Sequence, residues 1–161
     1  MRDSLGRSRD NPRRTLRMEL HEYLAILKAC GIDFRELAKK ERWAAMQRWR
    51  EVFAAALHAQ TGKWKDGQFE WHAFGRPYTR ALAGGRAMEA YRAEHAPSFF
   101  IVPEDPVLPA FECQGGQLPD FNAAYADVYV WPEDLAWTMA FTHEANLMEL
   151  GPYFSRREWA T

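Results

Sequence analysis

Three polar residues follow an apolar stretch near the end of the chain, in the sequence AWTMAFTHE. Thr142, His143 and Glu144 have the side-chain types of acid–base chemistry, since histidine titrates near neutral pH and a polar neighbour can orient its ring. Asp134, Glu144 or a hydroxyl group could supply that orientation. His143 could equally donate a hydrogen bond to the backbone or to Tyr153 and only close a strand, and the sequence leaves both interpretations open.

Metal binding by these residues needs ligands from elsewhere in the chain. The zinc-protease pattern has two histidines one helical turn apart with a glutamate between them, and it does not occur here. Neighbouring residues of a strand point to opposite faces, so we expect His143 and Glu144 not to bind one metal together. A site would have to recruit His72, Glu70 or Cys113. We therefore predict no metal site and no cofactor.

Nucleophilic catalysis has no recognisable motif in this chain. The sequence contains no GxSxG, and Cys30 and Cys113 have no catalytic context. In a reducing compartment both cysteines are expected to be ordinary core thiols. The sequence predicts no catalytic residue.

A tryptophan lies close to a histidine in two segments, EWHAF and AWTMAFTHE. If these segments are neighbouring strands, their side chains and those of the last strand would form one surface. We call this predicted surface the aromatic–polar patch, and it comprises Trp71, His72, Trp137, Thr142, His143, Glu144 and Tyr153. The alternative is that the two tryptophan rings pack in the core.

Composition and charge exclude several classes of protein. The 161 residues are 47% hydrophobic and 14% aromatic, which is typical of one globular domain with a substantial core. A net charge of −1 without a long basic run in the main body argues against nucleic acid, and no apolar run is long enough for a membrane span. A cytoplasmic location is the default expectation.

The first 17 residues differ from the rest, because they carry six Arg and two Asp and almost no core residues. We predict a flexible basic arm over residues 1–17 and a single domain over residues 18–161.

The first third of the domain has helical periodicity. Residues 18–30 form a predicted helix that ends before Gly31, and a second helix is expected to start at once, because Asp33 and Glu36 have the spacing of a capping box. Large residues then recur at steps of three or four and predict one buried helical face, made of Trp43, Met46, Trp49, Phe53 and Leu57.

The remainder favours short strands around one further helix, over residues 84–95. Predicted strands cover residues 69–74, 98–102, 110–114, 127–131, 135–143 and 151–156. The tight turn WPED joins two of them as an antiparallel hairpin. We predict an α+β fold with N-terminal helices packed on a mainly antiparallel sheet of about 4–6 strands.

The strand over residues 135–143 alternates in side-chain size. Trp137, Met139 and Phe141 predict a large apolar face, and Thr138 and Ala140 predict a small, more polar one. A half-buried strand is expected.

Several of these motifs together resemble a family of small bacterial proteins, the domain of unknown function 4275. The matching residues are Trp49 and Phe53, Trp71 to Phe74, Trp137 with Thr142 to Glu144, and Gly151 to Phe154. The resemblance covers residues 31–154, except for the unmatched segment EDPVLPAFECQGGQLPD. It implies a bacterial, cytoplasmic protein, and it implies no activity because the family is uncharacterised.

Two functions from different classes fit these observations. The first is a non-catalytic module that binds another protein, such as an immunity or inhibitor protein that neutralises a toxin, since aromatic residues are abundant and no catalytic pattern is complete. The alternative is a small hydrolase or metal-assisted enzyme that uses His143 and Glu144.

Overall fold

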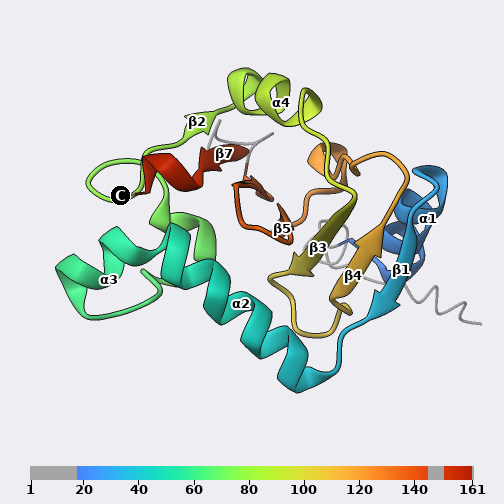
Figure 1. Cartoon of the computed structure of the whole chain (residues 1–161), viewed down its shortest axis with the longest axis horizontal. Coiled ribbons are helices and arrows are strands. Elements are labelled where there is room, and N and C mark those ends of the chain that lie inside the picture. The colour runs from blue at the N-terminus through green and yellow to red at the C-terminus, as the bar shows by residue number, and fades with distance from the viewer. Residues whose placement is uncertain (1–17, 145–150, 161) are drawn as a thin grey trace, which may run out of the picture.

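The structure is a computed structural model, and it describes residues 18–144 and 151–160. Within these residues, four α-helices and seven strands form the predicted α+β fold (Figure 1). The predicted basic arm over residues 1–17 lies outside the described residues.

All seven strands belong to one antiparallel sheet, whose order is β1-β4-β3-β5-β6-β7-β2. The strands are β1 (Asp33–Glu36), β2 (Leu82–Ala83), β3 (Ser98–Pro103), β4 (Phe111–Gln114), β5 (Val128–Pro132), β6 (Trp137–Phe141) and β7 (Tyr153–Arg156). The prediction of about 4–6 strands is too low. It missed β1 and the two-residue β2, and it included residues 69–74, which are not a strand.

The helices are α1 (Leu20–Ala29), α2 (Lys39–Phe53), α3 (Ala55–Thr61) and α4 (Gly85–Arg92), with short 3₁₀ helices η1 (Glu70–Ala73), η2 (Asn122–Ala124) and η3 (Arg157–Trp159). As predicted, the first helix stops before Gly31, whose positive φ of 66° suits glycine. None of the helices within the described ranges has the length and apolar character that a membrane crossing requires.

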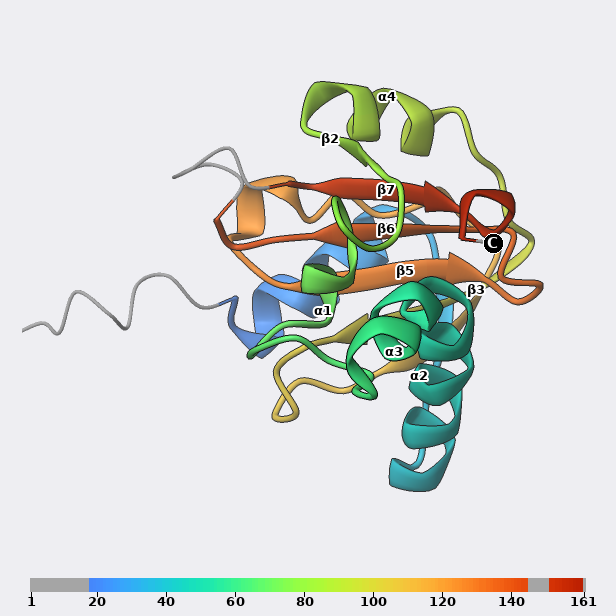
Figure 2. The ribbon, with the colours of Figure 1, turned by 90° about the vertical axis from the view of Figure 1, so that its left-hand side faces the viewer.

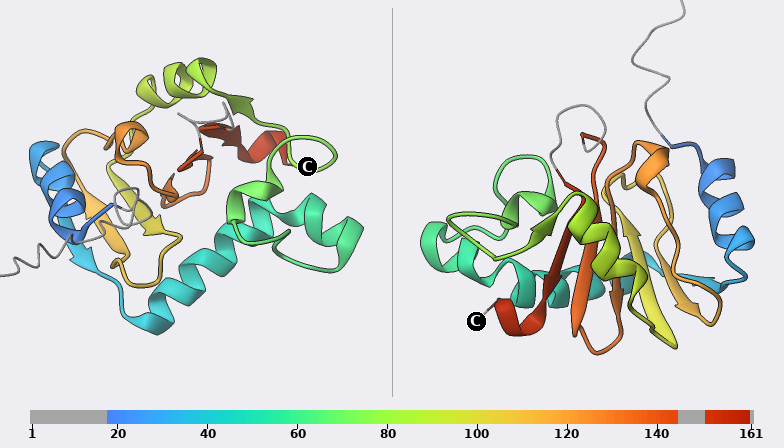
Figure 3. Two further views of the ribbon diagram at one scale, coloured as in Figure 1. Left: turned by 180° about the vertical axis from the view of Figure 1, so that it is seen from behind. Right: turned by 90° about the horizontal axis from the view of Figure 1, so that it is seen from above.

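Helices cover both faces of the sheet. Residues of α1 and α4, such as Tyr23 and Tyr91, belong to the apolar cluster on one face, and residues of α2 and η1, such as Trp49 and Trp71, belong to the cluster on the other. Seen from above, α4 crosses in front of the strands and α2 runs behind them (Figure 3). The domain is therefore a central sheet between two layers of helices.

Strand β6 is buried on both faces, so the expectation of a half-buried strand is wrong. The predicted alternation itself is confirmed, because Trp137, Met139 and Phe141 join the cluster of α1 and α4. The small side chain of Thr138 faces α2, where the Trp49 indole Nε1–H donates a 2.9 Å hydrogen bond to its hydroxyl oxygen. The Trp49 ring of α2 occupies the space beside position 138, so the residue there has to be small.

The segment after Gly31 is strand β1 and not the start of a helix. Residues 33–36 pair with β4, and α2 begins only at Lys39. The predicted capping box at Asp33 and Glu36 is wrong, since the Ala38 backbone N–H donates to the Glu41 side chain at 3.0 Å. Ladder bonds with β4 satisfy the backbone of this segment better than a new helix would.

The predicted apolar face of α2 is buried except at its start. Met46, Trp49 and Phe53 are buried, as is Leu57 in α3, but Trp43 is 65% exposed. The helix joins the core only from Ala45 onward, and its first turns extend beyond the strands in Figure 2.

The hydrogen bond from Trp49 to Thr138 predicts a measurable contribution to stability. Replacing Trp49 by Phe removes the donor and leaves a small gap at a fully buried site, so we expect the free energy of unfolding to fall by about 2 kcal/mol. Urea unfolding would measure it. Trp43→Phe on the same helix is the matched control and should change stability by less than about 0.5 kcal/mol; equal effects of the two substitutions would contradict the assignment.

Candidate functional site

Acidic and imidazole side chains meet at one end of three neighbouring strands. Strand β3 ends where β5 begins, because Pro103 pairs with Val128, and Val128 in turn pairs with Phe141 at the end of β6. Glu104, Asp127 and His143 lie within one or two residues of these positions along the chain. The antiparallel topology therefore brings together side chains that are far apart in the sequence.

The segment around Trp71 is a 3₁₀ turn and not the predicted strand over residues 69–74. Its backbone donors bond to side chains of the sheet end: the Trp71 N–H donates to the Tyr129 hydroxyl at 2.9 Å, and the Glu70 N–H donates to Glu104 Oε1 at 2.6 Å. In a strand, the backbone N–H groups of Glu70 and Trp71 would instead donate to carbonyl oxygens of a neighbouring strand.

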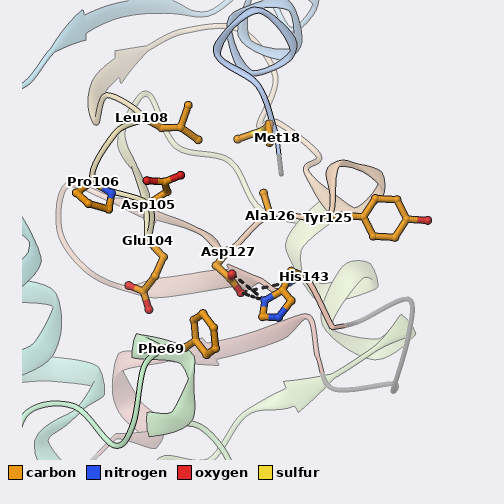
Figure 4. Close-up of a pocket in the computed structure, with 10 residues that line it drawn as sticks. All are labelled: Met18, Phe69, Glu104, Asp105, Pro106, Leu108, Tyr125, Ala126, Asp127 and His143. Carbon is orange, nitrogen blue, oxygen red and sulfur yellow. Dashed lines mark hydrogen bonds and ion pairs between the residues drawn. The ribbon is translucent and has the colours of Figure 1, made fainter. Parts of the chain in front are cut away.

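Asp127 accepts hydrogen bonds from two parts of the chain. Its Oδ1 accepts the Trp71 indole N–H at 2.8 Å and the backbone N–H of His143 at 3.2 Å. The His143 ring nitrogen Nδ1 lies 2.8 Å from Oδ2, as the dashed lines in Figure 4 show. A carboxylate with this many donors is fixed in orientation and in turn fixes the imidazole ring.

His143 and Glu144 do not diverge as predicted. Strand β6 ends at Phe141, so the alternation of a strand does not extend to these residues. His143 Nε2 lies 3.5 Å from Glu144 Oε1. The imidazole ring of His143 thus has a carboxylate beside each of its two nitrogens.

Glu70, which is itself almost fully buried, belongs to a second group of charges. It is 3% exposed, and its Oε1 accepts the Arg50 Nε–H at 3.0 Å. Lys65 Nζ lies 3.7 Å from Glu104 Oε1. Two cations and two carboxylates therefore lie close together around Glu70, namely Arg50, Lys65, Glu70 and Glu104. Such pairing offsets the cost of burying charge.

Glu104 keeps its proton to an unusually high pH. Burial raises the pKa of this carboxyl to about 7, and the negative charges of Glu70 and Asp127 act in the same direction, while the Glu70 N–H and Lys65 act in the opposite one. Glu104 therefore titrates near neutral pH, well above the range of ordinary carboxyl groups.

His143 and Glu104 line a cavity of about 430 Å³, which we call the His143 cavity (Figure 4). Its lining residues are Met18, Phe69, Glu104, Asp105, Pro106, Leu108, Tyr125, Ala126, Asp127 and His143. The Phe69 ring lies against His143, with 5.0 Å between ring centroids. The cavity combines an apolar lining with carboxyl groups and one imidazole.

The structure brings together some residues of the predicted aromatic–polar patch and separates others. Trp71 stacks on Tyr153 at 6.0 Å and contacts His72 at 4.3 Å between ring centroids. Trp137 lies on the opposite face of the sheet, packed against Tyr91, so it is not part of the patch. The alternative interpretation, core packing of the two tryptophan rings, is correct for both, since Trp71 is buried in the cluster on the other face of the sheet.

His72 and His143 contact the same ring but do not share a cavity. Both lie against Phe69, yet His72 lines a separate hollow beside Arg76 and Tyr78. Its Nδ1 is 2.5 Å from the Asp66 carbonyl oxygen, to which it can donate a hydrogen bond.

Thr142 and Tyr153 are held close to Glu144. Thr142 is buried, and the backbone of Gly151 comes so close that a Cβ atom there would lie 2.9 Å from the Thr142 side chain. With a φ of 90° as well, position 151 requires glycine. Burial and the charge of Glu144 together raise the pKa of the Tyr153 hydroxyl.

Sequence reasoning missed Phe69, Glu104 and Asp127 as site residues. The sequence carries only a partial signal, because Glu104 and Asp127 stand directly beside segments rich in β-branched and aromatic residues. Only the pairing of β3 with β5 shows that they are neighbours.

Among the described residues, no group of three or more His, Cys, Asp and Glu side chains is arranged to hold a metal ion.

Comparison with known families finds a match for this chain. The family described as "Domain of unknown function (DUF4275)" matches residues 21–154. The chain belongs to this family. No curated protein and no solved structure matches this chain. The DUF4275 match confirms the resemblance seen in the sequence, and it begins further toward the N-terminus, within α1.

The raised pKa of Glu104 predicts a pH-dependent difference in stability. The folded carboxyl holds its proton up to about pH 7, whereas the unfolded one loses it near its ordinary pKa of 4.5. Stability is therefore lost as the pH rises through this window, by up to about 3 kcal/mol. Glu104→Gln should abolish this loss and be more stable than the wild type at pH 8.

Urea unfolding of both proteins at pH 5 and at pH 8 would measure this effect. Glu112→Gln on β4, a more exposed position outside the cavity, is the control for loss of one carboxylate. Equal stability differences between wild type and Glu104→Gln at the two pH values would contradict the assignment.

Proposed function

We propose that this DUF4275 protein is a protein-binding module. The observation that carries the proposal is the placement of its exposed large apolar side chains. Among the described residues these are Leu20, Trp43, Val107 and Tyr125. Tyr125 lines the His143 cavity, and the other three line a neighbouring cavity of about 860 Å³.

The two cavities adjoin, because Glu104 and Pro106 line both of them. We call the region formed by their lining residues the docking face. Exposed apolar residues are normally scattered, and their collection in one region is typical of an interaction surface. A tryptophan that is 65% exposed would lose much water-accessible area on binding, as the central residues of interfaces do.

The docking face is already ordered by contacts within the chain. Arg42 donates to the carbonyl oxygens of Pro103 and Leu108, at 2.7 and 2.5 Å, which fastens the loop carrying Val107 to α2. Arg42 therefore belongs to the structure of the face and not to its free charges. A surface that needs no ordering on binding keeps more of its contact energy.

Charged side chains surround the apolar part. Glu36 and Lys39 line the larger cavity, one from β1 and one from the start of α2. An apolar centre with a charged rim is the usual anatomy of a specific protein interface.

Within this class we propose an immunity or inhibitor protein that neutralises a toxin, acting in the bacterial cytoplasm. An inhibitor needs only a preformed surface and a single domain, and the docking face supplies the surface. Free thiols at Cys30 and Cys113 suit a reducing compartment.

Substitutions on the docking face should abolish a complex without unfolding the protein. The partner would be captured on tagged protein from source cells, identified, and titrated as a purified protein. Trp43→Ala and Val107→Asp should each weaken its binding at least about tenfold, because they remove apolar contact or bury a charge. The inhibitor role further requires that the wild-type protein, but not the variants, suppresses the partner's activity.

Arg86→Ala is the control, since this exposed residue lies on α4, across the sheet from α2. It should bind the partner like the wild type. Failure to capture any stoichiometric partner, or full binding by Trp43→Ala, would refute the proposal.

A further inference from the structure

The contact between Asp127 and His143 determines which nitrogen of the imidazole ring carries the proton. The proposed protein binding does not depend on this property. A carboxylate has only acceptor sites, so the imidazole nitrogen that faces it must carry the proton. Nδ1 has a carboxylate oxygen of Asp127 at the hydrogen-bond distance of 2.8 Å, whereas Glu144 Oε1 is 3.5 Å from Nε2. In the neutral ring the proton is therefore on Nδ1, and the lone pair of Nε2 is the basic site of the side chain.

The ring is held in this orientation from several sides. Asp127 is anchored by the Trp71 indole N–H, Phe69 lies against the imidazole, and the His143 backbone N–H also donates to Asp127. The side chain of His143 is nonetheless 33% exposed and lines the His143 cavity. A partly exposed base that its neighbours fix at the wall of a cavity can meet a small molecule.

A proton gained at Nε2 would lie beside a second carboxylate. The resulting imidazolium would have Asp127 at Nδ1 and Glu144 Oε1, 3.5 Å from Nε2, on its other side. The ring that takes the proton is thus flanked by a carboxylate at each nitrogen.

The lining of the cavity limits the substrate. Glu104, Asp105 and Asp127 contribute carboxyl groups, and no Lys or Arg occurs among the lining residues that the structure describes. Phosphate and carboxylate compounds would be repelled. Phe69 and Leu108 offer apolar contact to an uncharged molecule with a ring or short carbon chain.

We propose that His143 is a catalytic general base, with Asp127 as its positioning residue, for proton abstraction from a small uncharged carbon acid such as a carbonyl compound. Nε2 takes a proton from the carbon next to the carbonyl group, and the electron pair of that C–H bond moves onto the carbonyl oxygen to give an enolate. The enolate then takes a proton back from Nε2. This activity lies beyond the proposed protein binding: His143 and Asp127 belong to the docking face, but their chemistry does not depend on Trp43 or Val107.

The probe is 5-nitrobenzisoxazole, an uncharged aromatic compound whose reaction requires only a base. His143 Nε2 would take the ring C–H proton, the electron pair of that bond would complete a nitrile, and the N–O bond would break. The product, a cyano-nitrophenolate, is coloured, and the proton leaves His143 for water. Wild-type protein should give saturable turnover well above the rate in buffer.

Asp127→Asn is the decisive variant. The carbonyl oxygen of the introduced amide can still accept from Trp71, but its NH₂ group would donate to Nδ1 and force the proton onto Nε2, which removes the base. We expect kcat to fall by about 100-fold or more with little change in KM. Nitrogen-15 NMR should show the His143 ring proton on Nδ1 in the wild type and on Nε2 in the variant.

His143→Ala should lose the activity while it remains folded, because the side chain is part-exposed. His21→Ala is the control, since this histidine is 81% exposed and lies outside the cavity, and it should react like the wild type. No saturable turnover by the wild type, or turnover retained in His143→Ala, would overturn the proposal. So would an Nε2–H tautomer in the wild type.

Discussion

The carboxylate of Asp127 is the constraint on which the arrangement of this site depends. It accepts hydrogen bonds from the Trp71 indole and from the backbone of His143, and it faces the His143 ring. Segments that are distant in the sequence are thereby fastened to the end of one sheet. The Asp127 side chain is largely buried, and a buried carboxylate is stable only when donors pair with it. Loss of one of these donors would therefore weaken the other contacts of Asp127.

The same requirement explains why η1 is a turn and not a strand. A strand would give its backbone donors to a neighbouring strand, but here the Tyr129 hydroxyl and the Glu104 carboxyl accept them. Both acceptors come from the sheet end itself. Trp71 can then lie over this end and stack against Tyr153, which covers that part of the core.

Local patterns in the sequence predict the parts of this fold that depend on neighbouring residues. The alternation along β6, the turn after β5 and the glycine end of α1 are all of this kind. The strand predicted over residues 69–74 is wrong because the aromatic residues of this segment pack against the end of the sheet. Packing of this kind leaves no regular spacing of apolar residues in the sequence. Glu104 and Asp127 escaped notice because their proximity follows from strand order, and no local pattern encodes strand order.

Glu104 connects the two cavities physically, since its side chain belongs to the wall of each. Burial raises its pKa to about 7, so the charge of this shared wall is near balance between two states at neutral pH. When Glu104 is protonated, Lys65 loses a carboxylate partner at 3.7 Å, and the wall becomes more positive toward both cavities. A protein that contacts the larger cavity of the docking face would bury Glu104 further and so favour its protonated form. Binding at the larger cavity would thereby change the electrostatic environment of His143 in the adjoining one.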